Sequence, residues 1–336
     1  MNKVAVLGSG SWGTALAITL AKKGYDTNIW ARRSSLAQEL NENKENKQYL
    51  PGVVIPNNIY SSADLEKVIH KAKYIVMSIP THGIREVALQ LKNIIKPDSI
   101  LINTSKGIEP GTLMLQHEVI EEEIPEMYER IALLSGPSHA EEVGKELPTA
   151  VVVASRISEV ATEIQDLFIS PKFRVYTNLD VIGVEVGGAL KNVIALATGI
   201  ADGLGFGDNT KAAIITRGLT EIARIGKKMG ANDLTFAGLT GIGDLVVTCN
   251  SMHSRNRRAG IAIGQGKKLD TILAEMGMVV EGVRTCKATM ELSKKYDVEL
   301  PISKEVYNVL FEGVTPEKAV VNLMTRLKTH EVESVF

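Results

Sequence analysis

Residues 3–24, KVAVLGSGSWGTALAITLAKKG, carry the pattern that decides the fold of the first half of the chain. A short apolar run leads into Gly8, Gly10 and Gly13, spaced as G-x-G-x-x-G, and a helix-compatible stretch follows. In a strand–turn–helix context, such glycines permit a tight turn and close approach of the backbone to a pyrophosphate, and the helix N-terminus supplies amide donors. The pattern predicts a dinucleotide-binding unit. The alternative is a glycine-rich turn that binds no ligand.

The end of the second expected strand, TNIWA, indicates which dinucleotide is bound. NAD-binding proteins usually place an acidic residue about 20 positions after the glycine motif, on the ribose 2′-hydroxyl. Here Arg32 and Arg33 follow the strand without an acid. Because guanidinium groups match the oxygens of a phosphate, we predict that NADPH/NADP+ is preferred and that NADH/NAD+ is tolerated. The alternative is a solvated basic turn.

Apolar runs alternate with helical stretches as far as residue 178. The runs are KVAVLG, TNIWA, YIVMSI, SILINT, IALLS, TAVVVA and FRVYT. This alternation predicts an α/β, Rossmann-type, doubly wound parallel sheet over residues 1–178. The loops SIPTHG (78–83), NTSKGIEPG (103–111) and LSGPSHAEEV (134–143) follow strands, so we expect them to face one crevice. Each loop taken singly could instead be scaffold.

Beyond about residue 180 the strand pattern fades and helical periodicity takes over. We expect helices over 181–204, 210–229, 255–265, 281–295, 302–312 and 315–327. Glycine- or proline-marked stretches separate them: GLGFGD, MGAND, LTGIGD and ELP. Residues 179–336 are therefore predicted to form an all-helical domain, with the final KTHEVESVF (328–336) as a loosely held tail.

Composition narrows the class of protein. The formal charge of −1 gives no overall basicity for nucleic-acid binding, so anion recognition must be local. The N-terminus lacks the pattern of a signal peptide, and no apolar run looks long enough to span a bilayer. Cys249 and Cys286 form no CxxC pair and are expected to be buried or idle thiols in a reducing cytoplasm. The six histidines are scattered without an HExxH pattern, so no metal site is expected.

The stretch VGGALKNVIALATG, residues 186–199, places Lys191 among small and apolar residues. A buried ammonium is costly unless it is paired or its pKa falls. On a helix, Gly188, Asn192 and Ala195 share its face, so the ammonium is expected to point into open space. The alternative is a lysine whose stem follows the helix while its charge reaches solvent.

Two further stretches carry polar groups. Asp244 lies in AGLTGIGDLVVTCNS, and Ser254, Arg255 and Asn256 lie in MHSRNRRAG. The Ser-Arg-Asn triplet has donors suited to a small phosphate, although it could also be an exposed basic helix start. Asp244 could be only a helix N-cap.

Together these motifs resemble the bacterial-type glycerol-3-phosphate dehydrogenase family over nearly the whole chain. The segments that carry the resemblance are GSGSWGTALA, NTSKGIE, SGPSHAEEV, GGALKNVIALATGIADGLGFGDNTKAA and GLTGIGDLVVTCNSMHSRNRRAG. Related 3-hydroxyacid dehydrogenases tend to have Asn three or four residues after the lysine. Here positions 194 and 195 are Ile and Ala, and Asn192 is adjacent to the lysine.

The resemblance implies a C-terminal domain like that of 6-phosphogluconate dehydrogenase and a role for each matching residue. Lys191 would be the catalytic proton donor and acceptor. The substrate-binding set would be Lys106, Gly136, Ser138, Lys191, Asp244, Ser254, Arg255 and Asn256. The cofactor-binding set would be Gly8, Gly10, Ser11, Trp12, Gly13, Arg32, Arg33, Lys106, Ala140, Arg255, Val279 and Glu281.

The implied reaction is reversible reduction of dihydroxyacetone phosphate to sn-glycerol 3-phosphate with NAD(P)H, for glycerophospholipid synthesis in the cytoplasm. Lys191 would donate a proton to the C2 oxygen, beside the nicotinamide. Burial, or a cation such as Lys106, would lower its pKa from about 10.4. A homodimer without nucleic-acid or membrane partners is expected. Two alternatives remain: a related reductase of another small anion, and a non-catalytic dinucleotide sensor.

Overall fold

The computed structural model describes residues 3–331, which form two compact units. Within that range, unit 1 comprises residues 3–105 and 116–181, and unit 2 comprises residues 106–115 and 182–331. The predicted single boundary after residue 178 is wrong for residues 106–115. Ile108 and Leu115 are buried in the apolar core of unit 2, and this burial ties the segment to the later half of the chain.

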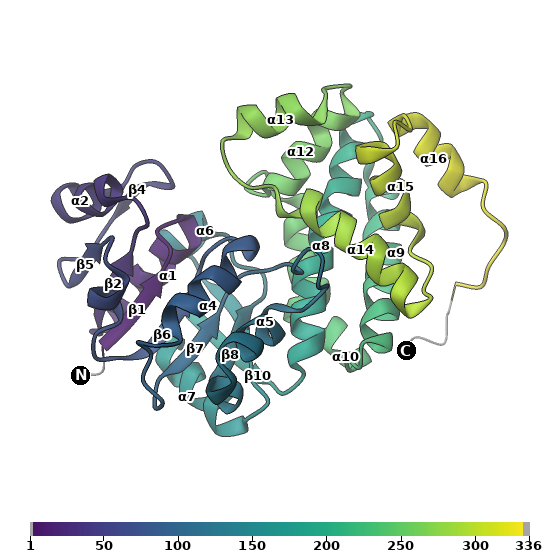
Figure 1. Ribbon diagram of the computed structural model, residues 1–336. Coiled ribbons are helices and arrows are strands. Elements are labelled where there is room, and N and C mark those ends of the chain that lie inside the picture. The colour runs from purple at the N-terminus through teal and green to yellow at the C-terminus, as the bar shows by residue number, and fades with distance from the viewer. Residues whose placement is uncertain (1–2, 332–336) are drawn as a thin grey trace. The chain divides into compact units, whose positions relative to one another are not determined.

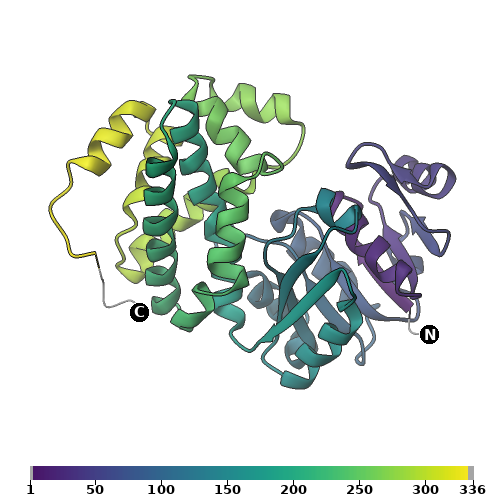
Figure 2. The ribbon, with the colours of Figure 1, turned by 180° about the vertical axis from the view of Figure 1, so that it is seen from behind.

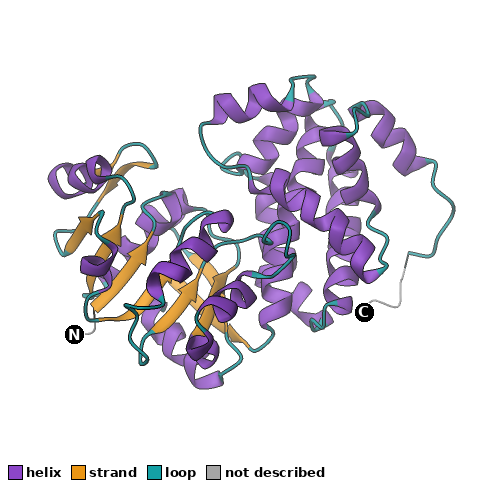
Figure 3. Ribbon diagram, viewed as in Figure 1, coloured by secondary structure: helices purple, strands orange, loops and turns teal. Residues whose placement is uncertain are grey.

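Strands occur in unit 1, as the orange arrows of Figure 3 show. The strands are β1 (Lys3–Leu7), β2 (Asp26–Trp30), β3 (Glu45–Asn46), β4 (Leu50–Val54), β5 (Ile59–Ser62), β6 (Ala72–Met77), β7 (Ile100–Asn103), β8 (Ile131–Ser135), β9 (Thr149–Ala154) and β10 (Phe173–Asn178). The helices of unit 1 are α1 (Ser11–Lys22), α2 (Ser34–Asn43), α3 (Leu65–Ile69), α4 (Ile84–Leu91), α5 (Gln116–Glu123), α6 (Ala140–Gly144) and α7 (Ser158–Phe168).

Eight of these strands form one sheet in the order β10-β9-β8-β7-β6-β1-β2-β5. Neighbours are parallel except β8 and β9, which are antiparallel because the chain returns between them through the short helix α6. The expected doubly wound sheet is confirmed, with this one reversal. The antiparallel pair β3–β4 and the strand β5 were not predicted. Pro51 and Gly52 interrupt β4, and two of the four residues of β5 are serines.

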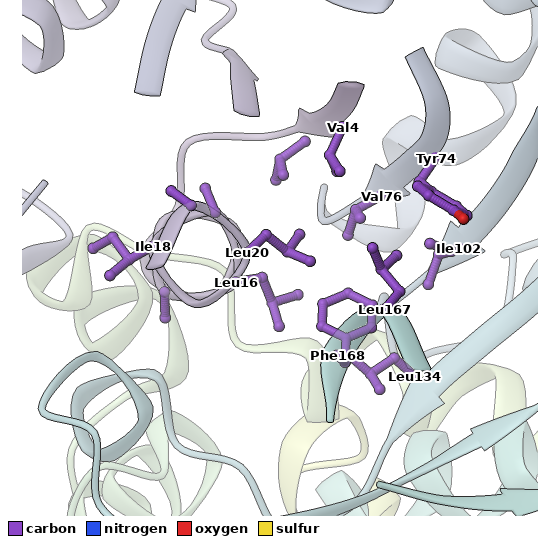
Figure 4. Packing of buried hydrophobic residues seen from close by; sticks show 14 of the residues in the cluster. Val4, Leu16, Ile18, Leu20, Tyr74, Val76, Ile102, Leu134, Leu167 and Phe168 are labelled. Carbon is purple, nitrogen blue, oxygen red and sulfur yellow. The ribbon is translucent and has the colours of Figure 1, made fainter. Parts of the chain in front are cut away.

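Helices cover both faces of the sheet (Figures 1 and 2). In Figure 4, Leu16 and Leu20 of α1 point toward Leu167 and Phe168 of α7, over the strand residue Val76. Because the central strands β1, β6, β7 and β8 are buried on two sides, their apolar residues run consecutively, whereas the edge strand β10 alternates buried and exposed residues at its start.

Register aligns the carboxyl ends of the central strands. Leu7 pairs with Trp30 on one side and with Met77 on the other, and Met77 pairs with Asn103, which pairs with Leu133. The residues that follow these strands therefore start from one edge of the sheet, as predicted. From Lys106 onward, however, the loop after β7 belongs to unit 2.

Unit 2 is helical, as expected. Its helices are α8 (Val181–Gly203), α9 (Asp208–Lys228), α10 (Asp233–Phe236), α11 (Asp244–Asn250), α12 (Arg255–Gly264), α13 (Leu269–Met276), α14 (Glu281–Tyr296), α15 (Pro301–Phe311) and α16 (Pro316–Met324). Figure 2 shows them in colours from teal to yellow. The short helices α10, α11 and α13 were not predicted. Residues 332–336 of the predicted loose tail lie outside the described residues.

Glycines bring α8 and α12 into close contact. A Cβ atom on Gly199 would lie 2.2 Å from the Arg257 carbonyl oxygen, and one on Gly260 would lie 2.3 Å from the Leu196 carbonyl oxygen. Gly203 and Gly264 repeat the arrangement one turn later. Since any side chain here would force the helices apart, these glycines set the position of α12 against the helix that carries Lys191.

We expected no apolar segment long enough to span a bilayer. One helix contradicts this expectation when only its length and composition are considered. Helix α8 has 23 residues and a mean hydropathy of 1.4 over its most apolar window. Within the structure, 94% of that window is buried. The apolar character of α8 is thus explained by its place as the core helix of unit 2, where Val186, Leu190 and Ile194 join the apolar cluster.

Candidate functional site

The three glycines of the turn after β1 have three different environments. Gly8 has φ +114°, and a Cβ there would lie 2.2 Å from the Ser78 carbonyl oxygen. A Cβ on Gly13 would lie 2.0 Å from the Gly8 carbonyl oxygen, whereas a Cβ on Gly10 would meet no atom within 4 Å. Gly8 thus permits the turn, Gly13 permits the helix to pack against it, and Gly10 leaves open space for an approaching ligand.

The N-terminus of α1 is suited to an anion. Its N-cap, Gly10, provides no side chain, and the first turn contains no acidic residue. Amide groups at such a helix start are available as donors, and the helix dipole favours negative charge. Ser11 donates from Oγ to the Tyr49 carbonyl oxygen at 2.6 Å, and Trp12 is half-buried against the core. The residues therefore fit the pyrophosphate of a dinucleotide.

Arg32 and Arg33 follow β2 and are both exposed. Arg33 Nη2 donates to Gln48 Oε1 at 2.6 Å and to the Tyr49 hydroxyl oxygen at 3.3 Å. These partners are neutral, and within residues 3–331 no ion pair involves either arginine. The charge that would attract a 2′-phosphate is therefore not neutralised by an acid.

The loop after β8 holds the remaining predicted residues of unit 1. Gly136 has φ +119°, and a Cβ there would lie 3.1 Å from the Val151 Cα. Ser138 donates from Oγ to the Gly136 carbonyl oxygen at 3.0 Å, and Ala140 begins α6. The structure places Gly136 and Ser138 in the loop after the carboxyl end of β8, and Ala140 at the helix start that ends this loop. Their predicted ligand contacts stay predictions.

In unit 2, Lys191 is only 6% exposed and is paired. Its Nζ forms an ion pair with Asp244 Oδ1 and donates to Thr248 Oγ1 at 2.8 Å. The other carboxylate oxygen of Asp244, Oδ2, accepts from Lys106 Nζ at 2.6 Å. The expectation that the ammonium points into open space is wrong, because Asp244 and Thr248 on α11 occupy the space that small residues leave.

Burial and the neighbouring charges shift the pKa values of Lys191 and Asp244. Burial lowers the pKa of Lys191 to about 8, the attraction of Asp244 opposes that shift, and the repulsion of Lys106 adds to it. For Asp244, which is 1% exposed, burial would raise the pKa, but the two ammonium groups outweigh burial and the pKa lies below its usual value. The centre is therefore a carboxylate held between two lysines, one of which can lose its proton near neutral pH.

Asp244 reaches this position through an unusual turn. Residues 239–243 form a π-helical turn directly before α11, and a Cβ on Gly241 would lie 2.0 Å from the Phe236 carbonyl oxygen. Gly241 is therefore required for the close approach of the two backbone segments. The prediction that the glycines of LTGIGD only end a helix is wrong for this residue. The N-cap alternative for Asp244 is also wrong, because Gly243 is the N-cap and the carboxylate binds lysines.

Asn256 joins three helices. Its Nδ2 donates to Asn192 Oδ1 at 2.8 Å, and its Oδ1 accepts from the Gly282 backbone N–H at 2.9 Å. A side chain at Gly282 would collide with the Asn192 carbonyl oxygen, because its Cβ would be only 2.6 Å away. Asn256 thus links the start of α12 to the residue beside Lys191 and to the start of α14.

The other predicted residues of unit 2 lie at helix starts. Ser254 is buried and caps α12, accepting from the Arg257 backbone N–H at 3.2 Å. Arg255 Nη1 donates to the Val279 carbonyl oxygen at 3.0 Å, and Glu281 begins α14. The structure therefore joins Arg255 to Val279, two residues predicted to share a ligand.

Sequence reasoning missed two residues of the cluster. Thr248 contacts both Lys191 and Asp244, and its spacing of four residues from Asp244 on one helix is the signal that could have found it. Asn192 was noted only as a neighbour of Lys191, whereas its side chain binds Asn256.

A cavity of about 940 Å³ also lies in unit 2, bordered by α9, α15 and α16. None of the sequence-predicted site residues lines it, so its volume says nothing about the lysine centre.

Both cysteines are fully buried, as expected, and burial raises each thiol pKa to about 12.

The chain contains a Rossmann-type unit with an open glycine turn and a helical unit with a buried lysine whose pKa is lowered. This combination defines the class of nicotinamide-dependent dehydrogenases. Two family models identify the branch of that class. NAD-dependent glycerol-3-phosphate dehydrogenase N-terminus matches residues 3–161, and NAD-dependent glycerol-3-phosphate dehydrogenase C-terminus matches residues 180–321. The chain belongs to the NAD-dependent glycerol-3-phosphate dehydrogenase family.

Individual relatives agree over the full length. The chain is 58% identical to the NAD(P)+ glycerol-3-phosphate dehydrogenase of Bacillus licheniformis over 337 residues, covering 100% of this chain and 97% of the relative. It is 58% identical to that of Pelotomaculum thermopropionicum, covering 99% and 96%. The crystal structure of glycerol-3-phosphate dehydrogenase from Coxiella burnetii superposes with a TM-score of 0.92 at 38% identity, covering 97% of this chain and 99% of that one.

Proposed function

We propose that this chain catalyses the reversible, NAD(P)H-dependent reduction of dihydroxyacetone phosphate to sn-glycerol 3-phosphate. The observation that carries the proposal is the buried Lys191, paired with Asp244 and holding a pKa of about 8. The names of the relatives support the substrate. A dinucleotide sensor without catalysis would have no use for a lysine of this kind.

Lys191 is the proton donor and acceptor in this proposal. The ammonium hydrogen-bonds to the C2 oxygen of the ketone and gives its proton to that oxygen as negative charge develops. In the reverse direction the neutral amine takes the proton from the C2 hydroxyl. A pKa of about 8 lets one side chain serve both directions near neutral pH, which an ordinary lysine cannot do.

Asp244 and Lys106 set the properties of Lys191. Asp244 holds the ammonium by one carboxylate oxygen and holds Lys106 by the other, so both cations keep fixed positions. Thr248 Oγ1 accepts a hydrogen bond from a second N–H of Lys191, which leaves the third N–H to point in a defined direction. The cluster keeps one net positive charge, which favours an anionic substrate.

The start of α12 is proposed to hold the substrate phosphate. No acid stands in its first turn, and Arg255 is near the helix N-terminus, so charge and dipole both favour an anion. Asn256 ties this helix start to the residue next to Lys191. We assign Ser254, Arg255 and Asn256 to the phosphate end, with Lys106, Gly136 and Ser138 as further substrate contacts.

The nicotinamide cofactor supplies the hydride that is added to C2. The residues proposed to hold it are Gly8, Gly10, Ser11, Trp12, Gly13, Arg32, Arg33, Lys106, Ala140, Arg255, Val279 and Glu281. The open side of Gly10, the exposed Arg32, and Arg33 with its neutral partners support a dinucleotide that carries a 2′-phosphate. NADPH is therefore proposed as the preferred cofactor, in a cytoplasmic homodimer that feeds glycerophospholipid synthesis.

A steady-state assay that combines each cofactor with several ketones tests this function. The absorbance of the reduced nicotinamide is followed with dihydroxyacetone phosphate, unphosphorylated dihydroxyacetone and a 2-keto acid. We expect rapid oxidation of NADPH with dihydroxyacetone phosphate. The unphosphorylated ketone should lose most of its kcat/KM, because phosphate binding energy holds the reacting carbon in place. Equal turnover of both ketones, or faster turnover of the keto acid, would contradict the proposal.

A further inference from the structure

The last residue of β3 and the turn that leads to β4, together residues 46–49, connect the glycine turn to the arginine that follows β2. We name residues 46–49 the strap. Asn46, at one end, is 0% exposed, whereas Gln48, near the other end, is exposed. Every contact that follows lies within unit 1.

The buried end of the strap is fixed to the glycine turn. Asn46 Nδ2 uses both of its hydrogens, donating to the Ser9 carbonyl oxygen at 2.9 Å and to Thr14 Oγ1 at 2.8 Å. Its Oδ1 accepts from the Tyr49 backbone N–H at 3.2 Å. Tyr49 returns to the glycine turn, since its carbonyl oxygen accepts from Ser11 Oγ at 2.6 Å. Three of these hydrogen bonds bind the strap to residues on both sides of Gly10, and the one between Tyr49 and Asn46 lies within the strap.

The exposed end of the strap holds the arginine. Gln48 Oε1 accepts from Arg33 Nη2 at 2.6 Å, and the Tyr49 hydroxyl lies 3.3 Å from the same nitrogen. A long guanidinium side chain on the surface would otherwise sample many rotamers, at an entropic cost on binding a phosphate. Because Gln48 is neutral, it orients the guanidinium without cancelling its charge.

We propose that Gln48 determines the preference for a 2′-phosphorylated dinucleotide and that Asn46 positions it. Gln48 presents Arg33 to the 2′-phosphate as an oriented, uncompensated cation. Asn46 holds the strap at a constant distance from the turn that takes the pyrophosphate, so one cofactor can meet both groups at once. The inference rests on the proposed function for the identity of the cofactor.

Substitution of Gln48 by Glu tests the proposal. The change is nearly isosteric and keeps an acceptor for Arg33. It places a carboxylate beside the guanidinium that should bind the phosphate, so the charge of Arg33 is compensated. Because a charge-assisted hydrogen bond to the phosphate is weakened, NADPH should bind at least about tenfold more weakly. NADH, which lacks the 2′-phosphate, should change by less than about twofold. The dissociation constants are measured by nucleotide fluorescence, without substrate.

Three further variants make the measurement specific. Asn57→Asp introduces the same amide-to-acid change at an exposed position of unit 1 and should leave both affinities unchanged. Gln48→Met removes the acceptor without adding charge and should weaken NADPH alone, by about two- to threefold. Asn46→Ala releases the strap from the glycine turn and should weaken both cofactors. Melting temperatures confirm that each variant is folded.

The outcomes separate the strap from the proposed function. If Gln48→Glu leaves the ratio of NADPH to NADH affinity unchanged, or if Asn57→Asp changes it equally, the assignment of Gln48 is overturned. If Asn46→Ala binds both cofactors as the unaltered protein does, its positioning role is overturned. In either case, reduction of dihydroxyacetone phosphate with NADH would leave the proposed function intact. Lack of that reaction in the unaltered protein would refute the proposed function instead.

Discussion

Replacement of Asp244 by Asn should remove the proton donor from the lysine centre at neutral pH. The carboxylate binds Lys191 by one oxygen and Lys106 by the other, and it is 1% exposed. An amide of the same shape would leave two ammonium groups beside each other without a counter-charge. Removing one partner of a buried ion pair typically costs about 3–5 kcal/mol. Lys191 can avoid that cost by releasing its proton.

The size of the effect follows from the pKa of about 8 for Lys191. At pH 7 the ratio of ammonium to amine is then about ten to one. A penalty of 3–5 kcal/mol corresponds to a factor of about 160 to about 4,700 in proton affinity, at about 1.36 kcal/mol for each tenfold change. The ratio in Asp244→Asn therefore falls to between about one in 16 and one in 470. The kcat for ketone reduction at pH 7 follows the protonated fraction of Lys191, so it should fall by about 15-fold to about 430-fold.

The assay is the steady-state reduction of dihydroxyacetone phosphate at pH 6 to 9. In Asp244→Asn the kcat for reduction should recover partly as the pH is lowered, because protons return to Lys191. An unfolded variant would show no such recovery. Asp208→Asn makes the same change at an exposed carboxylate of unit 2 and should behave as the unaltered protein does. A kcat for Asp244→Asn within about twofold of the unaltered protein at pH 7, with the same pH profile, would refute this reasoning.

Three other changes have defined outcomes. Gly8→Ala should lower the melting temperature, because φ at Gly8 is +114° and a Cβ would lie 2.2 Å from the Ser78 carbonyl oxygen. Gly10→Ala should fold normally and bind NADPH more weakly, because a Cβ there meets no protein atom within 4 Å. Equal melting temperatures of the two variants would contradict this. Burial raises the pKa of Glu221 from 4.5 to about 7, so its contribution to stability is present below pH 4.5 and is lost as the pH rises to 7. Glu221→Gln should lose less melting temperature over that range than the unaltered protein, and parallel curves would count against the raised pKa. The thiols of Cys249 and Cys286 should not react with a disulfide reagent until the protein is unfolded, and rapid labelling of the folded protein would show that they are not buried as described.

Much of the fold could be predicted from local pattern. The apolar runs located seven of the eight strands of the large sheet, because strands buried on two faces leave a nearly unbroken apolar signature. The polar strand β5 and the hairpin β3–β4 lack that signature. The strap with Asn46 and Gln48 therefore remained unseen, although it contacts the motif from which the prediction began.

The contacts of the lysine centre could not be predicted from local sequence pattern. Lys191 was singled out because an ammonium among small residues needs an explanation, but its partner Asp244 is 53 residues away and Lys106 is 138 residues from Asp244. No periodicity reports such a pairing. The small residues around Lys191 indicated space, and only the structure shows that α11 fills it. Likewise, Gly241 was read as a stop, whereas it allows the backbone contact that precedes Asp244.

The most direct measurement compares Lys191→Met with the unaltered protein. The variant keeps a side chain of similar length without an ammonium, and NADPH binding should be unchanged because Lys191 is assigned to the ketone. The kcat for reduction of dihydroxyacetone phosphate should fall by about 10²–10⁴-fold, the usual contribution of a positioned proton donor. A kcat equal to that of the unaltered protein, with the variant folded, would show that Lys191 is not the proton donor.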